Sequence, residues 1–152
     1  MDEPKSRHLG ALASALQRVA AERPRQTAQH LLSIHAQIEA IERGDVESVL
    51  QHAHDDVTFE IFAPPQFPFI SSAHGLEELR AAVTHNFAAV VDQQPELRDI
   101  FAEGDTVILF GRERGRLRER GDRYDVEFVQ RFAFRDGRLA SVRIVVAEAA
   151  RQ

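Results

Sequence analysis

The sequence contains no cysteine. This absence excludes disulfide bridges, thiolate metal sites and a cysteine nucleophile. Long apolar runs are missing as well, and none approaches the roughly 20 residues of a membrane-spanning helix. The first residues, Met1-Asp2-Glu3-Pro4-Lys5, lack the basic and then apolar layout of a secretory signal. We therefore expect a soluble, cytoplasmic protein.

An excess of positive charge is missing too. The 19 basic residues are outnumbered by 24 acidic ones, which gives a formal net charge of −5. This balance argues against a dedicated nucleic-acid-binding protein. Apolar residues are plentiful. Of the 152 residues, 43% are hydrophobic and 28% are charged, a composition that supports one packed domain.

The first part of the chain has the periodicity of helices. Apolar residues three or four apart predict one helix over about residues 6–22 and a second from about Arg25 to Gly44. Asp45 is a suitable N-cap for a short third helix, and a fourth helix is predicted after Gly75.

The rest of the chain alternates with period two, as strands do. Val57 to Phe62 is the first predicted strand, and residues 69–71 form a short edge strand. A four-strand antiparallel meander follows, over about residues 96–103, 106–120, 123–134 and 138–147. We predict an α+β fold with helices on one face of a curved sheet. Residues 1–24 are an N-terminal helical extension, and residues 25–150 are the main domain.

The Gly121-Asp122 turn fixes a predicted register for the central hairpin. A two-residue turn with glycine first suits type II′, and outward pairing then places Glu113 opposite Gln130 on the buried face. The same register covers each strand glycine with a ring, Gly111 opposite Phe132 and Gly115 opposite Phe128.

The loop before the last strand decides the surroundings of Glu113. A two-residue turn would bring Arg143 beside Gln130, where it would pair with Glu113 and lower its pKa. We expect a three-residue loop over residues 135–137, which turns Val142 inward and leaves Arg143 in solvent. Glu113 is then a desolvated carboxyl with a raised pKa, able to act as a general acid or base. The alternative is a solvated or arginine-paired glutamate.

Five short motifs follow one another in a particular order and spacing along residues 40–150. They are Arg43-Gly44-Asp45, Asp55-Asp56-Val57, Pro65…Pro68…Gly75, Gly121-Asp122-Arg123-Tyr124-Asp125 and Phe132…Arg135-Asp136-Gly137-Arg138-Leu139. Together they resemble the SnoaL-like branch of the NTF2-like superfamily, which includes polyketide cyclases, ketosteroid isomerases and limonene epoxide hydrolase. The resemblance implies a cone, in which a curved antiparallel sheet wraps around helices and encloses a pocket. It also implies a dimer.

Most catalytic groups of these relatives are absent from the matching positions. The base of ketosteroid isomerases falls on Ile61, and their oxyanion-hole tyrosine and acid fall on Gln37 and Gln130. A carboxylate is retained at Glu113 alone. The catalytic residues of limonene epoxide hydrolase fall on Gly111, Glu113, Ile144, Phe59 and Ile61. The resemblance therefore favours the fold over either activity.

We expect a pocket protein that binds a small apolar molecule, without a cofactor or a metal. The alternative is an isomerase, cyclase or hydrolase that uses Glu113 as a general acid or base on a polyketide-, steroid- or terpenoid-like substrate. The predicted ligand-binding residues are Gln37, Phe59, Ile61, Phe128, Gln130, Phe132, Val142 and Ile144. No nucleic-acid or membrane partner is expected.

Three histidines have simpler interpretations than a role in catalysis. His35 could partner Glu113, but an ordinary surface histidine is favoured. His52 and His54 are two residues apart, which is not the i, i+4 spacing of a helical metal pair. We interpret this stretch as a solvated loop that leads into a strand.

Alternating arginines predict the outer face of the sheet. Arg116 and Arg118 are predicted to face Glu127 and Asp125, so we expect a solvated face or an ion-paired seam rather than an anion site. Beside these arginines we predict a homodimer interface formed by Ile108, Phe110, Val129 and Ala133.

Overall fold

The computed structural model describes residues 9–21 and 23–150. Its helices are α1 (Gly10–Ala21), α2 (Arg25–Glu42), α3 (Val46–Leu50) and α4 (Leu76–Ala88). The predicted ends of the first helix, at residues 6 and 22, lie outside the described residues. Gly44, with a φ of 77°, follows α2. The Asp45 carboxylate accepts a hydrogen bond from the Ser48 backbone N–H at 3.2 Å, so the predicted N-cap of α3 is confirmed.

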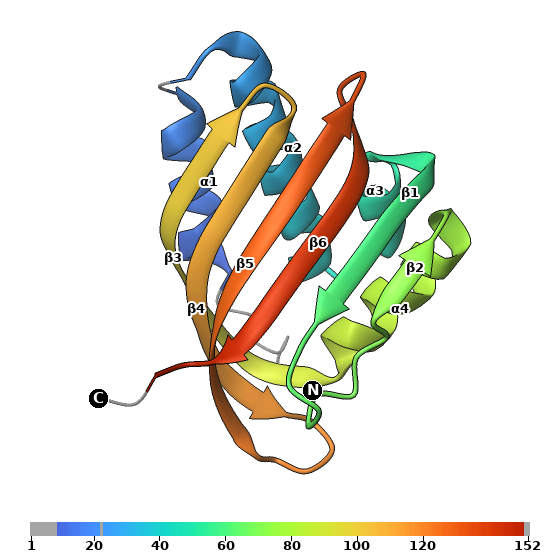
Figure 1. Ribbon diagram of the computed structural model, residues 1–152, viewed down its shortest axis with the longest axis vertical. Coiled ribbons are helices and arrows are strands. Elements are labelled where there is room, and N and C mark those ends of the chain that lie inside the picture. The colour runs from blue at the N-terminus through green and yellow to red at the C-terminus, as the bar shows by residue number, and fades with distance from the viewer. Residues whose placement is uncertain (1–8, 22, 151–152) are drawn as a thin grey trace.

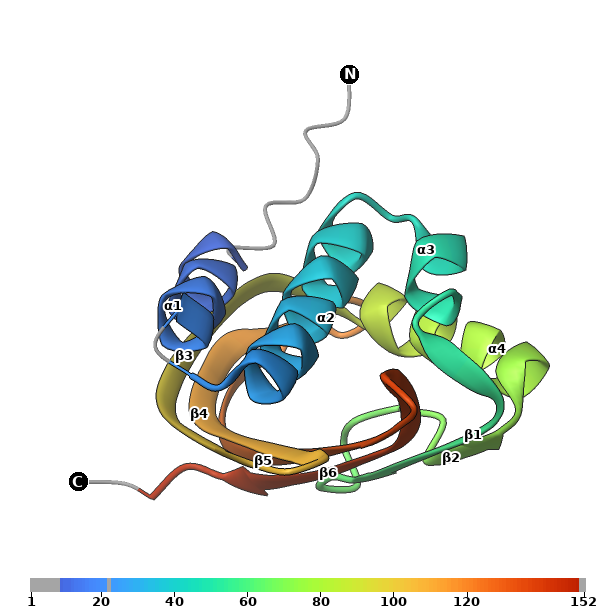
Figure 2. The same ribbon diagram turned by 90° about the horizontal axis from the view of Figure 1, so that it is seen from above.

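The strands form one curved sheet in the order β2-β1-β6-β5-β4-β3. Neighbouring strands are antiparallel, except that β1 and β6 run parallel. Figures 1 and 2 show α1 and α2 on the concave side of this sheet, so the predicted α+β class is confirmed. The strand bounds are β1 (Ala53–Phe62), β2 (Ser72–His74), β3 (Val90–Glu103), β4 (Thr106–Leu117), β5 (Arg123–Arg135) and β6 (Arg138–Glu148).

Three strand boundaries differ from the prediction. β1 begins at Ala53 because this residue already pairs with Leu139 of β6, so His54 lies in the strand and not in a loop. β3 begins at Val90, well before residue 96, and includes Pro95. Because β3 is an edge strand, it tolerates a residue without a backbone N–H. The short edge strand is formed by residues 72–74 rather than 69–71.

The β4–β5 hairpin has a different register from the predicted one. Glu113 is opposite Val126 instead of Gln130, a displacement of four residues. Because four is an even number, each side chain keeps its predicted face although its partner changes. The strand glycines still make room for rings, but Gly111 lies against Phe128 and Gly115 against Tyr124, so the predicted partners were wrong.

The register differs from the predicted one because β4 ends at Leu117, before the predicted end at about residue 120. The Arg118 backbone N–H donates to the Ala89 carbonyl oxygen at 2.9 Å, and its Nε donates to the Ala88 carbonyl oxygen at 2.6 Å. These contacts with the end of α4 replace pairing with β5. The loop between β4 and β5 is closed by the Gly121 N–H, which donates to the Leu117 carbonyl oxygen at 2.8 Å.

The β5–β6 turn is shorter than predicted, yet Val142 still points inward as predicted. It consists of residues 136–137 alone, whose φ values of 52° and 79° suit a type I′ turn, so the three-residue loop was wrong. A register shift just after the turn restores the inward direction of Val142. Arg143 points to the outer face, where its Nε lies 3.7 Å from the Glu60 carboxylate, so it does not pair with Glu113.

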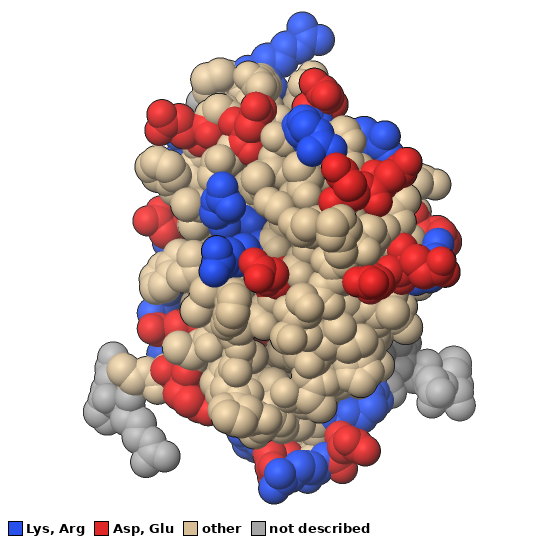
Figure 3. All heavy atoms as spheres, turned by 45° about the vertical axis from the view of Figure 1, so that its right-hand side comes forward, with Lys and Arg blue, Asp and Glu red and all other residues tan. Residues whose placement is uncertain are grey.

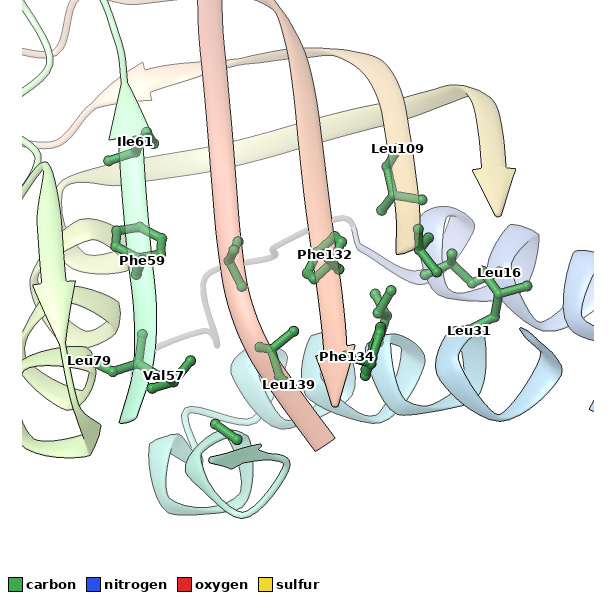
Figure 4. Packing of buried hydrophobic residues seen from close by; sticks show 14 of the residues in the cluster. Leu16, Leu31, Val57, Phe59, Ile61, Leu79, Leu109, Phe132, Phe134 and Leu139 are labelled. Carbon is green, nitrogen blue, oxygen red and sulfur yellow. The ribbon is translucent and has the colours of Figure 1, made fainter. Parts of the chain in front are cut away.

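A hydrophobic core fills the space between the sheet and the helices. Figure 4 shows Phe59 and Ile61 from β1 and Phe132 and Phe134 from β5 contributing to this layer. The N-terminal extension is part of the same core, because Leu16 of α1 is fully buried in it. Burial of these side chains drives the helices onto the sheet and leaves the middle of the cone lined by apolar groups.

The outer face of the sheet carries ion pairs and a row of exposed apolar residues. Arg112 and Arg114 both contact Asp125, and Arg116 pairs with Asp92. The predicted pairs of Arg116 with Glu127 and of Arg118 with Asp125 were wrong, because they assumed the other register. Direct cross-strand pairing aligns four exposed apolar side chains, Phe62, Val145, Val129 and Phe110. Figure 3 brings the β1–β2 side forward and shows a broad uncharged area with charged residues mainly above and below it.

Candidate functional site

Two adjoining cavities lie inside the cone, with volumes of about 140 and 170 Å³. All the residues predicted for the pocket line one or both of them. Ile61 lines the smaller cavity, and Gln37, Phe132 and Val142 line the larger one. The remaining predicted residues line both cavities and are Phe59, Glu113, Phe128, Gln130 and Ile144.

Glu113 reaches the cavities from the middle of β4. Burial among apolar side chains raises the pKa of this carboxyl above its ordinary value of 4.5, because a charged form loses the solvation of water. Two hydrogen bonds, from Tyr124 and Gln93, oppose this effect and favour the ionised form. In the described residues no arginine, lysine or histidine forms an ion pair with Glu113. The carboxyl is therefore held by neutral donors alone.

Tyr124 supplies the shorter of these hydrogen bonds. Its hydroxyl donates to Oε2 of Glu113 at 2.5 Å, and burial together with the nearby carboxylate raises the pKa of Tyr124. The hydroxyl therefore keeps its proton and acts as a donor. Gly115 permits this position, because a Cβ there would lie 2.5 Å from the tyrosine oxygen. The side chain of Tyr124 also packs edge-on against Phe67.

Gln93 is the second partner of Glu113. Its Nε2 lies 3.5 Å from Oε2 of the carboxylate, at the limit of hydrogen bonding, and its own Oε1 is buried without a partner among the described residues. An unpaired buried acceptor costs about 1–3 kcal/mol of folding free energy.

The sequence analysis missed both partners of Glu113. Tyr124 could have been found by strand parity, since it shares a face with Val126 and Phe128. Gln93 was missed because the strand was predicted to begin at about residue 96, whereas β3 begins at Val90.

The other polar residues considered for the site are engaged elsewhere. Gln37 is buried and its Nε2 donates to the Ser33 hydroxyl at 3.4 Å. His35 lies 3.5 Å from Glu39 on its own helix and is not a partner of Glu113. His52 contacts Ser33, and His54 contacts the Arg135 carbonyl oxygen. Nowhere in the described ranges do three potential metal ligands gather.

The comparisons with known proteins agree on the fold. The model of the SnoaL-like domain family matches residues 34–142, well over half of the chain. A comparison with curated proteins gave no match. No helix among the described residues is long and apolar enough to cross a membrane.

Three solved structures illustrate the likeness. A candidate SnoaL-like polyketide cyclase from Jannaschia sp. CCS1 has a TM-score of 0.70 and 16% identity over 82% of this chain and 89% of that one. An NTF2-like protein from Burkholderia xenovorans LB400 has a TM-score of 0.67 and 18% identity over 80% and 91%. An epoxide hydrolase of the LEH-like type from M. tuberculosis has a TM-score of 0.61 and 18% identity over 82% and 86%. By its matched residues the chain belongs to the SnoaL-like domain family, and its fold is similar to that of the NTF2-like structure.

Proposed function

We propose that the protein binds a small, largely apolar molecule inside the cone, with a polar group of that molecule at Glu113. The observation that carries this proposal is a carboxyl that has no cationic partner within residues 9–21 and 23–150 and lies in a cavity lined mainly by aromatic and aliphatic side chains. Apolar walls supply the affinity for such a ligand, and a few polar groups orient it.

A pair of neighbouring variants on β6 tests this proposal. Ile144→Phe adds a ring to the cavity wall, whereas Val145→Phe adds the same ring to the exposed outer face. Titration calorimetry with naphthalene as the probe should detect binding to the wild type and to Val145→Phe, and at least tenfold weaker binding to Ile144→Phe. Equal affinities for all three proteins, or no binding to any, would contradict an internal binding site.

A second candidate is proton transfer by Glu113, which would make the protein an isomerase, cyclase or hydrolase. It is supported by the same carboxyl, because a raised pKa and neutral hydrogen-bond donors suit a general acid or base. The similar fold of a candidate cyclase and of an epoxide hydrolase fits this idea, although their functions belong to those proteins.

Carboxyl-resolved NMR titration addresses this second candidate, with Glu113→Gln used to assign the signal. The acid–base role requires a pKa of Glu113 above the ordinary 4.5. A value at or below 4.5 would overturn catalysis by Glu113 and leave the binding function intact.

We also propose that two copies associate through the outer face of the sheet. The row of Phe62, Val145, Val129 and Phe110 is flanked by charges of both signs. A two-fold axis along this row would bring Arg131 of one copy near Glu127 of the other, because these residues lie on opposite sides of Val129. An exposed apolar row with a charged rim is typical of protein interfaces.

A further inference from the structure

The two cavities can be read as two lobes of one binding site. We call the larger one the helix lobe, because residues of α1, α2 and α3 line it, Leu12, Ile34 and Val49 among them. We call the smaller one the tyrosine lobe, because Tyr124, with Phe67 and other apolar residues, lines it. The two lobes share a wall formed by Phe59, Val83, Phe87, Gln93, Glu113, Phe128, Gln130 and Ile144.

Unsatisfied polar groups gather at this shared wall. The Gln130 amide has no hydrogen-bond partner in the described part of the chain, and both hydrogen bonds of Glu113 end on Oε2, which leaves Oε1 open. Gln93, which lines the same wall, also has an unpaired Oε1. Of the three, the Gln93 oxygen is fully buried, while Gln130 and Glu113 are half-buried and line both cavities. Open polar groups on a cavity wall are the kind that a bound ligand satisfies.

Away from the shared wall, each polar side chain named here has at least one hydrogen-bond partner within the protein. In the helix lobe, Gln37 donates to Ser33. In the tyrosine lobe, the Asn86 amide makes two hydrogen bonds with the backbone of Ile70, at 2.8 and 3.1 Å. The Tyr124 hydroxyl is taken by Glu113. Each outer polar side chain therefore has at least one hydrogen-bond partner within the protein, and among these residues an open acceptor is left at Oε1 of Gln37, so the outer ends are mainly apolar.

The size of the lobes sets the size of the ligand. Each lobe, of about 140 or 170 Å³, is close to the roughly 150 Å³ of an apolar cavity that holds one benzene molecule. One six-membered ring or a branched chain of similar bulk fits each lobe.

We propose that the ligand has two apolar parts, one for each lobe, joined by a hydroxyl or carbonyl group that bonds to Gln130 and Glu113. This inference rests on the proposed binding function and specifies its ligand class. It separates a molecule with a central polar group from an amphiphile whose polar group stands at one end, since Gln130, Glu113 and Gln93 bring their open polar atoms together at the shared wall.

Three probes of similar size test the inference. Diphenylmethanol carries its hydroxyl between two rings, biphenyl-4-ylmethanol is an isomer with the hydroxyl at one end, and diphenylmethane lacks the hydroxyl. Titration calorimetry at neutral pH should show diphenylmethanol binding about fivefold or more tightly than either of the others, as one neutral hydrogen bond predicts. Gln130→Leu should remove most of this preference and keep diphenylmethane binding, while Gln94→Leu, an exposed residue of β3, should change neither.

The outcomes distinguish this inference from the proposed function. If diphenylmethane binds and the terminal alcohol binds as well as the central one, the central-group inference is wrong and the pocket function stands. A preference that survives Gln130→Leu also overturns the inference. If none of the three probes binds the folded wild type, the proposed function is wrong, and the inference with it.

Discussion

Replacing Tyr124 by phenylalanine isolates the hydrogen bond that holds Glu113. The ring stays in its place against Phe67, so the lost interaction is the 2.5 Å bond from the hydroxyl to Oε2. A bond to a charged partner is worth about 1.5–3 kcal/mol, and a neutral one about 0.5–1.5 kcal/mol. We therefore expect Tyr124→Phe to lower the free energy of unfolding by about 1.5–3 kcal/mol when Glu113 is ionised and by less when it is protonated.

Urea unfolding followed by circular dichroism measures this difference at one pH below and one pH above the Glu113 pKa that the carboxyl NMR titration gives. Each kcal/mol also lowers the Tm by about 2–4 °C in a domain of this size. In a Glu113→Gln background the same substitution should lose its pH dependence, because no carboxyl is left to titrate. An equal cost at both pH values in the wild-type background, or a cost below about 0.5 kcal/mol at the higher pH, would refute the reasoning.

The remaining predictions concern charge, packing and assembly. Burial raises the pKa of Glu113, so the folded state loses stability as pH rises from 4.5 through the raised pKa. Glu113→Gln should therefore raise the free energy of unfolding at pH 8 and leave it nearly unchanged at pH 4. Gly111→Ala should cost about 1–3 kcal/mol in urea unfolding, because its Cβ would lie 2.4 Å from the Glu96 carbonyl oxygen and 2.6 Å from the Phe128 ring; a neutral result would contradict the register. Val129→Arg should convert a dimer into a monomer in sedimentation equilibrium without changing the circular dichroism spectrum, and a wild-type protein that is monomeric at micromolar concentration would contradict the interface.

The face of a side chain was easier to predict than its partner. Alternation along β4 was enough to turn Glu113 inward, because the side-chain period of a strand is two and survives any even shift. The partner of Glu113 depended on the length of the 118–122 loop. That length is set by the contact of Arg118 with the end of α4, which is distant in sequence and leaves no local pattern.

The extent of β3 was hidden for a similar reason. A proline argues against a central strand, and only the position of β3 at the sheet edge makes Pro95 acceptable. Gln93 lies before the predicted start of the strand, at about residue 96, and was left out of the predicted site. Pocket residues such as Phe59 and Gln130 were predicted because parity and the resemblance to a family indicated the same positions.

The parallel pairing of β1 with β6 has a consequence for folding. Within the described sheet, the β1–β2 pair reaches the other strands only through β6, which follows them all in sequence. The Arg138 side chain bonds to the Ala53 carbonyl oxygen across 85 positions of sequence, and such distant contacts slow the search for the native state. During synthesis, β1–β2 and β3–β4–β5 cannot join into one sheet until β6 has left the ribosome. Until then, the edges of β1 and β5 that pair with β6 stay exposed. Chaperone binding to nascent chains should therefore be strongest just before β6 emerges.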